Sequence, residues 1–344
     1  MGGPGFEHAG MSQLKRILKS PLFRYLIGFI ISGLTLYLSF QNINLNDILY
    51  QLSQTNLVFL SLAVISLGVG FLFKIIRWKI LLGLRCSSVY LSQIGMSYLV
   101  AQMMNTFLGF RLGEVSRVYI LGRTGIEHAF VVGTIAIEMV LNMIATSFLF
   151  VLLLLIIPLP DWIEASGLAY LTVVVILAMV IFFATLYRSR LFEILFRWIR
   201  HIPGRLQPFL LTHVRNGLSS LEVLGSYSDL SKLAVLTTII WIVAVLTNHL
   251  VLMSLELDLP IAAALLVLVT MQVAVFIPSI PGKVGVFEYI CILSLGVYGV
   301  NQTLALSYGI LLHLAVYLPT IILGLVSLWV LRLDSKGENL TLIE

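Results

Sequence analysis

The sequence predicts an all-α integral membrane protein, a polytopic helical bundle with about six full spans and two oppositely directed re-entrant hairpins. Of its 344 residues, 59% are hydrophobic and only 11% are charged. Soluble domains carry about 25% charged residues, so the composition excludes the water-soluble classes. Apolar runs recur along almost the whole chain, and Lys and Arg gather on one side of them. Together these observations indicate one membrane-embedded unit.

A helix that crosses a bilayer needs roughly 20 apolar residues, and six apolar runs have about this length or more. They are Leu22–Phe40, Leu57–Ile76, Phe130–Ile157, Leu168–Tyr187, Leu233–Ser254 and Thr303–Leu331. Each is expected to be a full span. Three further runs are short or end in polar and Gly/Pro-rich sequence, and they predict broken helices: Ser88–Gly109, Ile261–Ile280 and Val286–Val300.

These runs divide the chain into three parts. We expect a basic cytoplasmic N-terminus over residues 1–20, a transmembrane domain over 21–332 and a cytoplasmic tail over 333–344. The transmembrane domain includes a cationic, amphipathic connector over 188–231. We expect its 188–215 portion to lie on anionic headgroups, although charge that only sets the topology would explain it nearly as well.

The Lys and Arg residues set the orientation, because cytoplasmic loops of membrane proteins are enriched in them. The loops on the other side contain acidic residues and no Lys or Arg: Asp47, Asp161, Glu164, Glu256 and Asp258. Both termini are therefore predicted to be cytoplasmic, in a multi-pass protein of the cell (plasma) membrane. The net charge of +5 is explained by this topology, so we expect no nucleic acid partner.

The same argument predicts the two re-entrant hairpins. If residues 88–125 enter from the cytoplasm and return, twenty of the 21 Lys and Arg lie on one side, with Lys283 as the exception. Residues 261–300 then enter and leave from the opposite side. Eight or nine shorter spans are the alternative. Both segments have an apolar helix, a Gly- or Pro-broken turn and an acidic residue that opens the next helix, which predicts an inverted repeat with its binding site at the breaks.

The first break is a candidate phosphate site. Backbone groups freed by a broken helix cannot be satisfied by lipid and must face a cavity or protein. A helix that restarts near Glu114 would aim free N–H groups and its positive dipole end into that cavity. An ordinary Arg–Glu pair in a cytoplasmic loop is the alternative. The candidate residues are Asn105, Arg111, Gly113, Glu114 and Arg117.

The second break is a candidate site of the same kind. Pro281 and Gly282 force a turn, Gly285 allows close backbone approach, and Lys283 is a good point-charge ligand for phosphate. A tight hairpin whose lysine reaches the interface is the alternative. Glu288 follows as the acidic residue of the next helix.

Glu138 and Asn142 form a third group, spaced i, i+4 on an otherwise apolar span. Because an ionised group inside a bilayer is costly, this carboxylate needs a cation, and the candidates are Arg111, Arg117 and Lys283. Proton binding and a purely structural ion pair remain open for Glu138. Asn248, His249 and His313 are more simply explained as hydrogen-bonded packing residues.

The motifs for soluble cofactor chemistry are missing from the sequence. We find no GxxxxGK[ST] loop for ATP, no HExxH, and only two cysteines, so no cofactor or metal is expected. An ion or lipid gradient would then drive any transport. The sequence is also compatible with a homo-oligomer.

The two breaks resemble the lysylphosphatidylglycerol synthase transmembrane-region family of flippase-like proteins over about residues 20–332. The first runs from Asn105 through Gly109-Phe-Arg-Leu-Gly-Glu114 to Arg117, similar to the family's Asn-x-x-x-Pro-x-Arg-x-Gly-Glu-x-x-Arg. The second, Pro281-Gly-Lys-Val-Gly-Val-Phe-Glu288, is similar to Pro-Gly-Gly-x-Gly-x-x-Glu. Glu138 stands where the family has Glu-Arg followed by an Asp.

This chain departs from the family pattern at five positions. Gly109 stands for a proline, Lys283 for a glycine, Met139 for an arginine, Asn142 for an aspartate and His313 for a common arginine. The missing arginine and aspartate put a charge relay around Glu138 in doubt.

The resemblance implies translocation of a membrane lipid with an anionic or aminoacylated phospholipid headgroup, or of a polyprenyl- or sugar-linked lipid. The site would be exposed alternately to the two sides, and the chain would not be an enzyme. Two-domain members carry an aminoacyl-transferase domain, which we expect to be lacking because the sequence ends thirteen residues after Leu331. The alternatives are a membrane enzyme acting on a lipid phosphate, with Glu114 or Glu138 as base, and a partner of a separate synthase.

Overall fold

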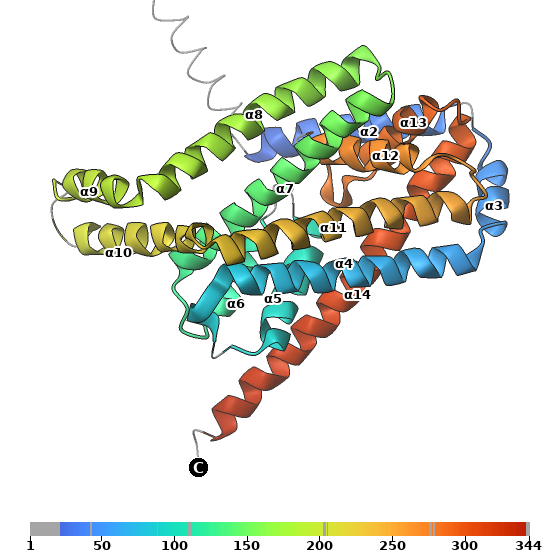
Figure 1. The fold of residues 1–344 in the computed structure, drawn as a ribbon. Helices are drawn as coiled ribbons and strands as arrows, with labels where there is room; N and C mark the ends of the chain where they lie inside the picture. Colours follow the sequence, from blue (N-terminus) through green and yellow to red (C-terminus); the bar gives the residue numbers. More distant parts are fainter. Residues whose placement is uncertain are drawn as a thin grey trace, which may run out of the picture.

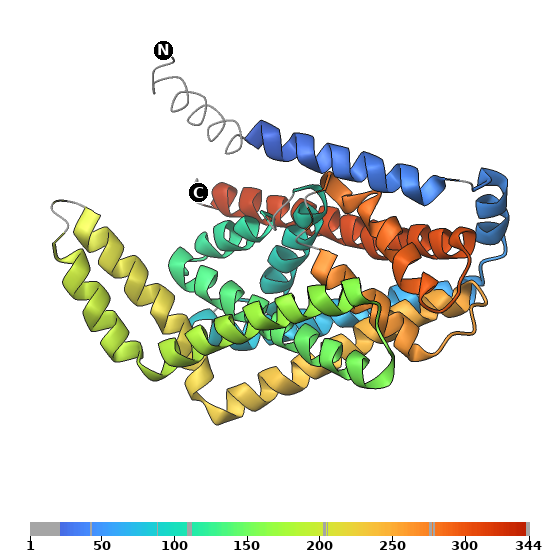
Figure 2. The same ribbon diagram turned by 90° about the horizontal axis from the view of Figure 1, so that it is seen from above.

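The computed structural model describes residues 21–41, 43–87, 89–108, 112–201, 204, 206–274, 277 and 279–341. Over these ranges the regular secondary structure is helical, as predicted (Figure 1). Long helices packed side by side form the body of the molecule, and two helices protrude from one end (Figures 1 and 2).

Within the part of the chain that the structure describes, five helices are long and apolar enough to cross a membrane. They are α4 (Leu57–Leu82), α7 (His128–Ile156), α8 (Asp161–Leu186), α11 (Tyr227–Ser254) and α14 (Gln302–Thr341). At 1.5 Å per residue, the 26 residues of α4 extend about 39 Å, more than the roughly 30 Å of hydrocarbon in a bilayer. These helices confirm five of the six predicted spans.

The sixth predicted span corresponds to α2 (Pro21–Phe40), whose Ile27–Phe40 part is a shorter apolar helix. α2 packs against the second break. A Cβ atom at Gly285 would overlap Ser32 O of α2, and the hydroxyl of Ser32 accepts a hydrogen bond from Ile280 N at 3.0 Å. Gly285 therefore allows the close backbone approach that the sequence predicts, and α2 fixes the neighbouring loop.

Both predicted breaks are present. The first separates α5 (Leu91–Phe107) from α6 (Glu114–Gly122), and the second separates α12 (Ile261–Ala274) from α13 (Val286–Gly296). At 1.5 Å per residue, α6, α12 and α13 are about 14, 21 and 17 Å long, too short to cross a bilayer alone.

The two broken pairs lie toward opposite ends of the bundle. The α5–α6 pair lies toward the protruding helices, and the α12–α13 pair lies toward α3 (Leu45–Ser53) (Figure 1). This placement and the helix lengths agree with oppositely directed hairpins, and the inverted repeat itself stays a prediction.

The predicted connector contains α9 (Arg188–Ile199), α10 (Leu206–Ser219) and the 3₁₀ turn η3 (Ser220–Gly225). α9 and α10 lie side by side and extend beyond the bundle (Figures 1 and 2). Large apolar side chains stay exposed on both, including Trp198 at 75% and Phe209 at 57%. An exposed apolar stripe next to arginines is typical of a helix that lies in a membrane interface.

Candidate functional site

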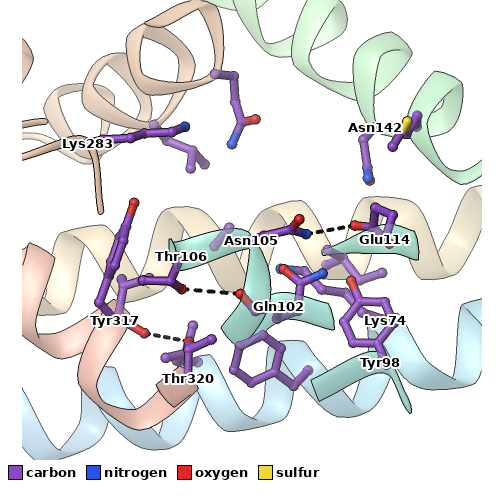
Figure 3. A pocket seen from close by; sticks show the side chains of 18 of the residues that line it. Lys74, Tyr98, Gln102, Asn105, Thr106, Glu114, Asn142, Lys283, Tyr317 and Thr320 are labelled. Carbon is purple, nitrogen blue, oxygen red and sulfur yellow. Dashed lines mark hydrogen bonds between the residues drawn. The ribbon is translucent and has the colours of Figure 1, made fainter. Parts of the chain in front are cut away.

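A cavity of about 440 Å³ opens between the two helix breaks (Figure 3). Its walls come from α4, α5, α6, α7, α11, α12 and α14 together with the loop between α12 and α13. α5 contacts the turn η4 (Pro281–Lys283), so the two breaks meet in space. The volume is within the range of about 300–1,000 Å³ that is usual for ligand sites.

The structure brings seven of the eleven predicted site residues to this cavity. These are Asn105, Glu114, Arg117, Glu138, Pro281, Gly282 and Lys283. Gly113, Gly285 and Glu288 are described but do not line it, and Arg111 lies outside the described residues. The role of Arg111 at the first break therefore stays a prediction.

The first break is closed by its own side chains. Asn105 Nδ2 donates to Glu114 Oε1 at 3.0 Å, and Arg117 Nη1 donates to Glu114 Oε2 at 2.8 Å. A Cβ atom at Gly113 would overlap the α5 backbone at Ala101 O. Gly113 is therefore a packing residue that lets α6 fold back against α5.

The expected anion site at the start of α6 is largely occupied by the chain itself. Val115 N donates to Leu112 O at 3.1 Å, and Ser116 N donates to Gly113 O at 2.9 Å. These two amides are not available to a ligand. The Glu114 carboxylate already complements the positive end of the helix dipole.

A buried ion network lies next to this break. Glu138 Oε2 accepts from Arg117 Nη2 at 2.6 Å, and Glu138 Oε1 accepts from Arg77 Nη2 at 3.3 Å. Arg77 also donates to Asn142 Oδ1 at 2.9 Å and to Thr237 Oγ1 at 3.1 Å. Arg117, one of the three cations predicted for Glu138, is thus a true partner.

Arg77 is the partner that sequence reasoning missed. The sequence predicts a span that ends at Ile76, just before Arg77, but α4 continues to Leu82 and Arg77 is 0% exposed. The available signal was electrostatic, because a carboxylate inside an apolar bundle needs compensation from any cation within reach. Which cation meets it depends on how α4 packs against α7.

Arg117 is also enclosed by aromatic rings. Its guanidinium carbon lies 3.7 Å from the Trp78 ring centroid and 4.7 Å from that of Tyr98. Stacking over an aromatic face stabilises a cation, and more so when both groups are desolvated. Arg117 donates hydrogen bonds to Glu114 and Glu138, and it thereby holds α6 against α4, α5 and α7. This role is structural.

The second break contains the predicted Pro281–Gly282 turn. Lys283 N donates to Ile280 O at 2.9 Å, and Gly282 has φ 79° and ψ −8°, the values of the third residue of a type II turn. Lys283 follows with φ 57°, in the left-handed region that favours glycine. Its side chain lies on the same side of the cavity as Tyr317 in Figure 3.

Glu288 lies beside the cavity and stabilises its wall. Its Oε2 accepts from Gly285 N at 2.7 Å, which caps α13, and its Oε1 lies 2.6 Å from His313 Nδ1 of α14. The His313 ring packs 4.5 Å from Phe287 and 4.2 Å from Tyr317, measured between centroids. His313 is therefore a hydrogen-bonded packing residue, which pairs with Glu288 and joins α13 to α14.

Several lining residues were not among the predicted site residues. They are polar or aromatic side chains on the long helices and at the two breaks: Lys74, Tyr98, Gln102, Gln272, Trp241 and Tyr317. Gln102 and Gln272 open the two similar break sequences, and this common position was a usable signal. Lys74 carries a different signal, since it is a cation inside the predicted span Leu57–Ile76, whereas Trp241 carries none because apolar sequence surrounds it.

The comparison with known families agrees with this architecture. The sequence profile described as Lysylphosphatidylglycerol synthase TM region matches residues 25–324. No curated protein matches the chain. The matched range contains both breaks, every described residue that lines the cavity, and four of the predicted full spans completely. The chain therefore belongs to the lysylphosphatidylglycerol synthase transmembrane-region family, and its role is related to membrane lipids.

Proposed function

We propose that this chain is a lipid translocase that holds a lipid headgroup in the cavity between its two helix breaks. One observation carries the proposal: breaks that lie toward opposite ends of the bundle line one cavity. Broken helices that meet in the interior are typical of transporters whose binding site lies at the repeat interface.

The depth of the cavity supports this function. Asn142 lies at the midpoint of α7 and Trp241 at the midpoint of α11, and both line the cavity. Helices of this length place their midpoints near the centre of a bilayer. A headgroup held there would be halfway across, with its acyl chains still in lipid, and alternating exposure of this site would complete the transfer.

The carboxylates support translocation over chemistry on the lipid. Glu114 and Glu138 both line the cavity, and both accept hydrogen bonds from Arg117. A general base must be able to reach and take a proton from its substrate. Two carboxylates engaged by arginine fit that role poorly, so we propose that the chain is not an enzyme.

The charge distribution supports an orientation with both termini in the cytoplasm of the cell membrane. In this orientation α9 and α10 lie at the cytoplasmic surface. We propose that their arginines contact anionic headgroups while Trp198 and Phe209 enter the interface. The cargo and this surface would then be the two lipid contacts of the protein.

The test is a translocation assay in proteoliposomes. Fluorescent phospholipid in both leaflets is reduced by external dithionite, and translocation raises the reduced fraction above that of protein-free vesicles. Ala244→Trp places an indole in the cavity wall and should abolish the increase. Ala234→Trp, at an exposed position of the same helix, should leave it unchanged.

Two results would overturn the proposal. One is a wild-type signal equal to that of protein-free vesicles, and the other is full activity of the Ala244→Trp variant. Conversion of the lipid to a new mass in the same vesicles would instead support a membrane enzyme.

A further inference from the structure

The charges around the cavity fall into two groups. The first is the buried network in which two arginines, Arg77 and Arg117, meet two carboxylates, Glu114 and Glu138. Formally this network is neutral. The second group is Lys74 of α4 and Lys283 of η4, which also line the cavity. Among the described residues that form the wall and this network, the formal charge is therefore +2.

The backbone at Lys283 indicates that its side chain has a use. Its φ of 57° is a conformation that costs a non-glycine residue energy and that glycine adopts freely. Strained positions of this kind gather at functional sites, where the side chain has a role. The turn before it is closed by Lys283 N to Ile280 O at 2.9 Å, and Ser32 of α2 holds Ile280 N. The lysine is thus presented to the cavity from a fixed support.

The cavity wall also contains a buried indole. Trp241 lines the cavity and is 7% exposed, and its Nε1 has no acceptor among the described residues. A buried donor without an acceptor is costly. An anionic oxygen in the cavity would be attracted by the two lysines.

We infer that the cavity selects lipids whose headgroup has a net negative charge and discriminates against aminoacylated headgroups. This inference rests on the proposed translocation of a lipid through the cavity. A phosphate headgroup meets two lysines. A lysyl headgroup instead brings ammonium groups toward a wall of net positive charge, and repulsion between like charges is strong where water is excluded.

The selectivity is tested by retention of lipids on the purified full-length chain. Equimolar phosphatidylglycerol and lysylphosphatidylglycerol are offered in detergent, and native mass spectrometry measures the ratio of bound species. We expect the wild type to retain the anionic lipid about tenfold or more over the aminoacylated one, as one charge-assisted contact would give.

Two variants with matched controls assign this preference to the lysines. Lys283→Gly removes the cation and introduces the residue that suits φ 57°, and Glu256→Gly, at the exposed residue with φ 56°, controls for the backbone effect. Lys74→Gln is matched by Lys79→Gln at an exposed position of the same helix. We expect each lysine variant of the cavity to lower the ratio about tenfold and each control to keep it.

The outcomes separate this inference from the proposed function. Equal or preferred retention of lysylphosphatidylglycerol, or an unchanged ratio in both lysine variants, overturns the inference even if dithionite assays show translocation. If inorganic phosphate binds in a lysine-dependent way and lipid does not bind, the claim that the recognised anion belongs to a lipid is overturned. Absence of translocation for both lipids overturns the proposed function itself.

Discussion

Arg117 Nη2 lies 2.6 Å from Glu138 Oε2, and this contact joins the short helix α6 to the long helix α7. The side chains are 2% and 5% exposed, so little water screens the pair. Arg77 approaches the other oxygen of the same carboxylate from α4. One carboxylate thus connects the consecutive helices α6 and α7 with α4, which is distant in the sequence.

Replacing Glu138 with Gln should strongly destabilise the protein, because it leaves two buried arginines next to a neutral amide. Removing one partner of a buried ion pair typically costs about 3–5 kcal/mol. Thermal unfolding in detergent would measure the loss. Glu127→Gln is the matched control, since its pair with Arg85 is 50% and 40% exposed and should contribute less than about 1 kcal/mol. Equal losses in both variants would contradict the prediction.

Replacing Gly285 with Ala should separate α2 from the second break. The new Cβ meets Ser32 O, and the backbone has φ 88°, so steric overlap adds to conformational strain. We expect a loss of about 3 kcal/mol or more. Gly299→Ala has φ 73° with no atom close to the new Cβ and should cost only about 1–2 kcal/mol. If the two unfolding temperatures fell equally, the packing of α2 against the loop would be wrong.

The thiol of Cys86 should react slowly at neutral pH. Cys86 ends η1 (Gly83–Cys86), outside the long helices, and is 1% exposed. Burial raises its pKa from the ordinary 9.0 to about 11. The reactive thiolate should therefore be about a hundredfold rarer at pH 7, and modification should accelerate as the pH approaches 11.

Peptide mass spectrometry after maleimide treatment distinguishes Cys86 from Cys291. A cysteine introduced by Lys79→Cys, at an exposed position of α4, provides the fast reference. Labelling of Cys86 at the rate of this reference at pH 7 would contradict the burial of η1.

The surface of α9 should respond to lipid charge. In nanodiscs with anionic phosphatidylglycerol, amide hydrogen exchange over residues 188–201 should be slower than in phosphatidylcholine alone, because headgroup contacts suppress local opening. A variant with Arg190, Arg197 and Arg200 changed to Gln should lose this difference. Exchange that is equal in both lipids for the wild type would show that these arginines only set the topology.

Local sequence determined the helices and their breaks. The apolar runs became helices close to the expected bounds, and Pro281 with Gly282 produced the expected turn, because these features depend on neighbouring residues. Two ends moved. α4 continued past Ile76 to Leu82 because Arg77 is compensated inside the protein, so a charged residue did not end the span.

The tertiary structure decided which polar groups meet and hence what each one does. Glu138 is 61 residues from Arg77 in the sequence, and Glu288 is 25 residues from His313. Pairing over such distances follows from helix packing, which no local pattern encodes. The sequence alone thus established a membrane bundle with two polar breaks. Only helix packing made Arg117 and Glu288 structural residues, because charge at membrane depth must be compensated by whichever helices come into contact. Packing also made Gly113 a contact between α5 and α6. It brought Lys74 to the cavity wall opposite the second break.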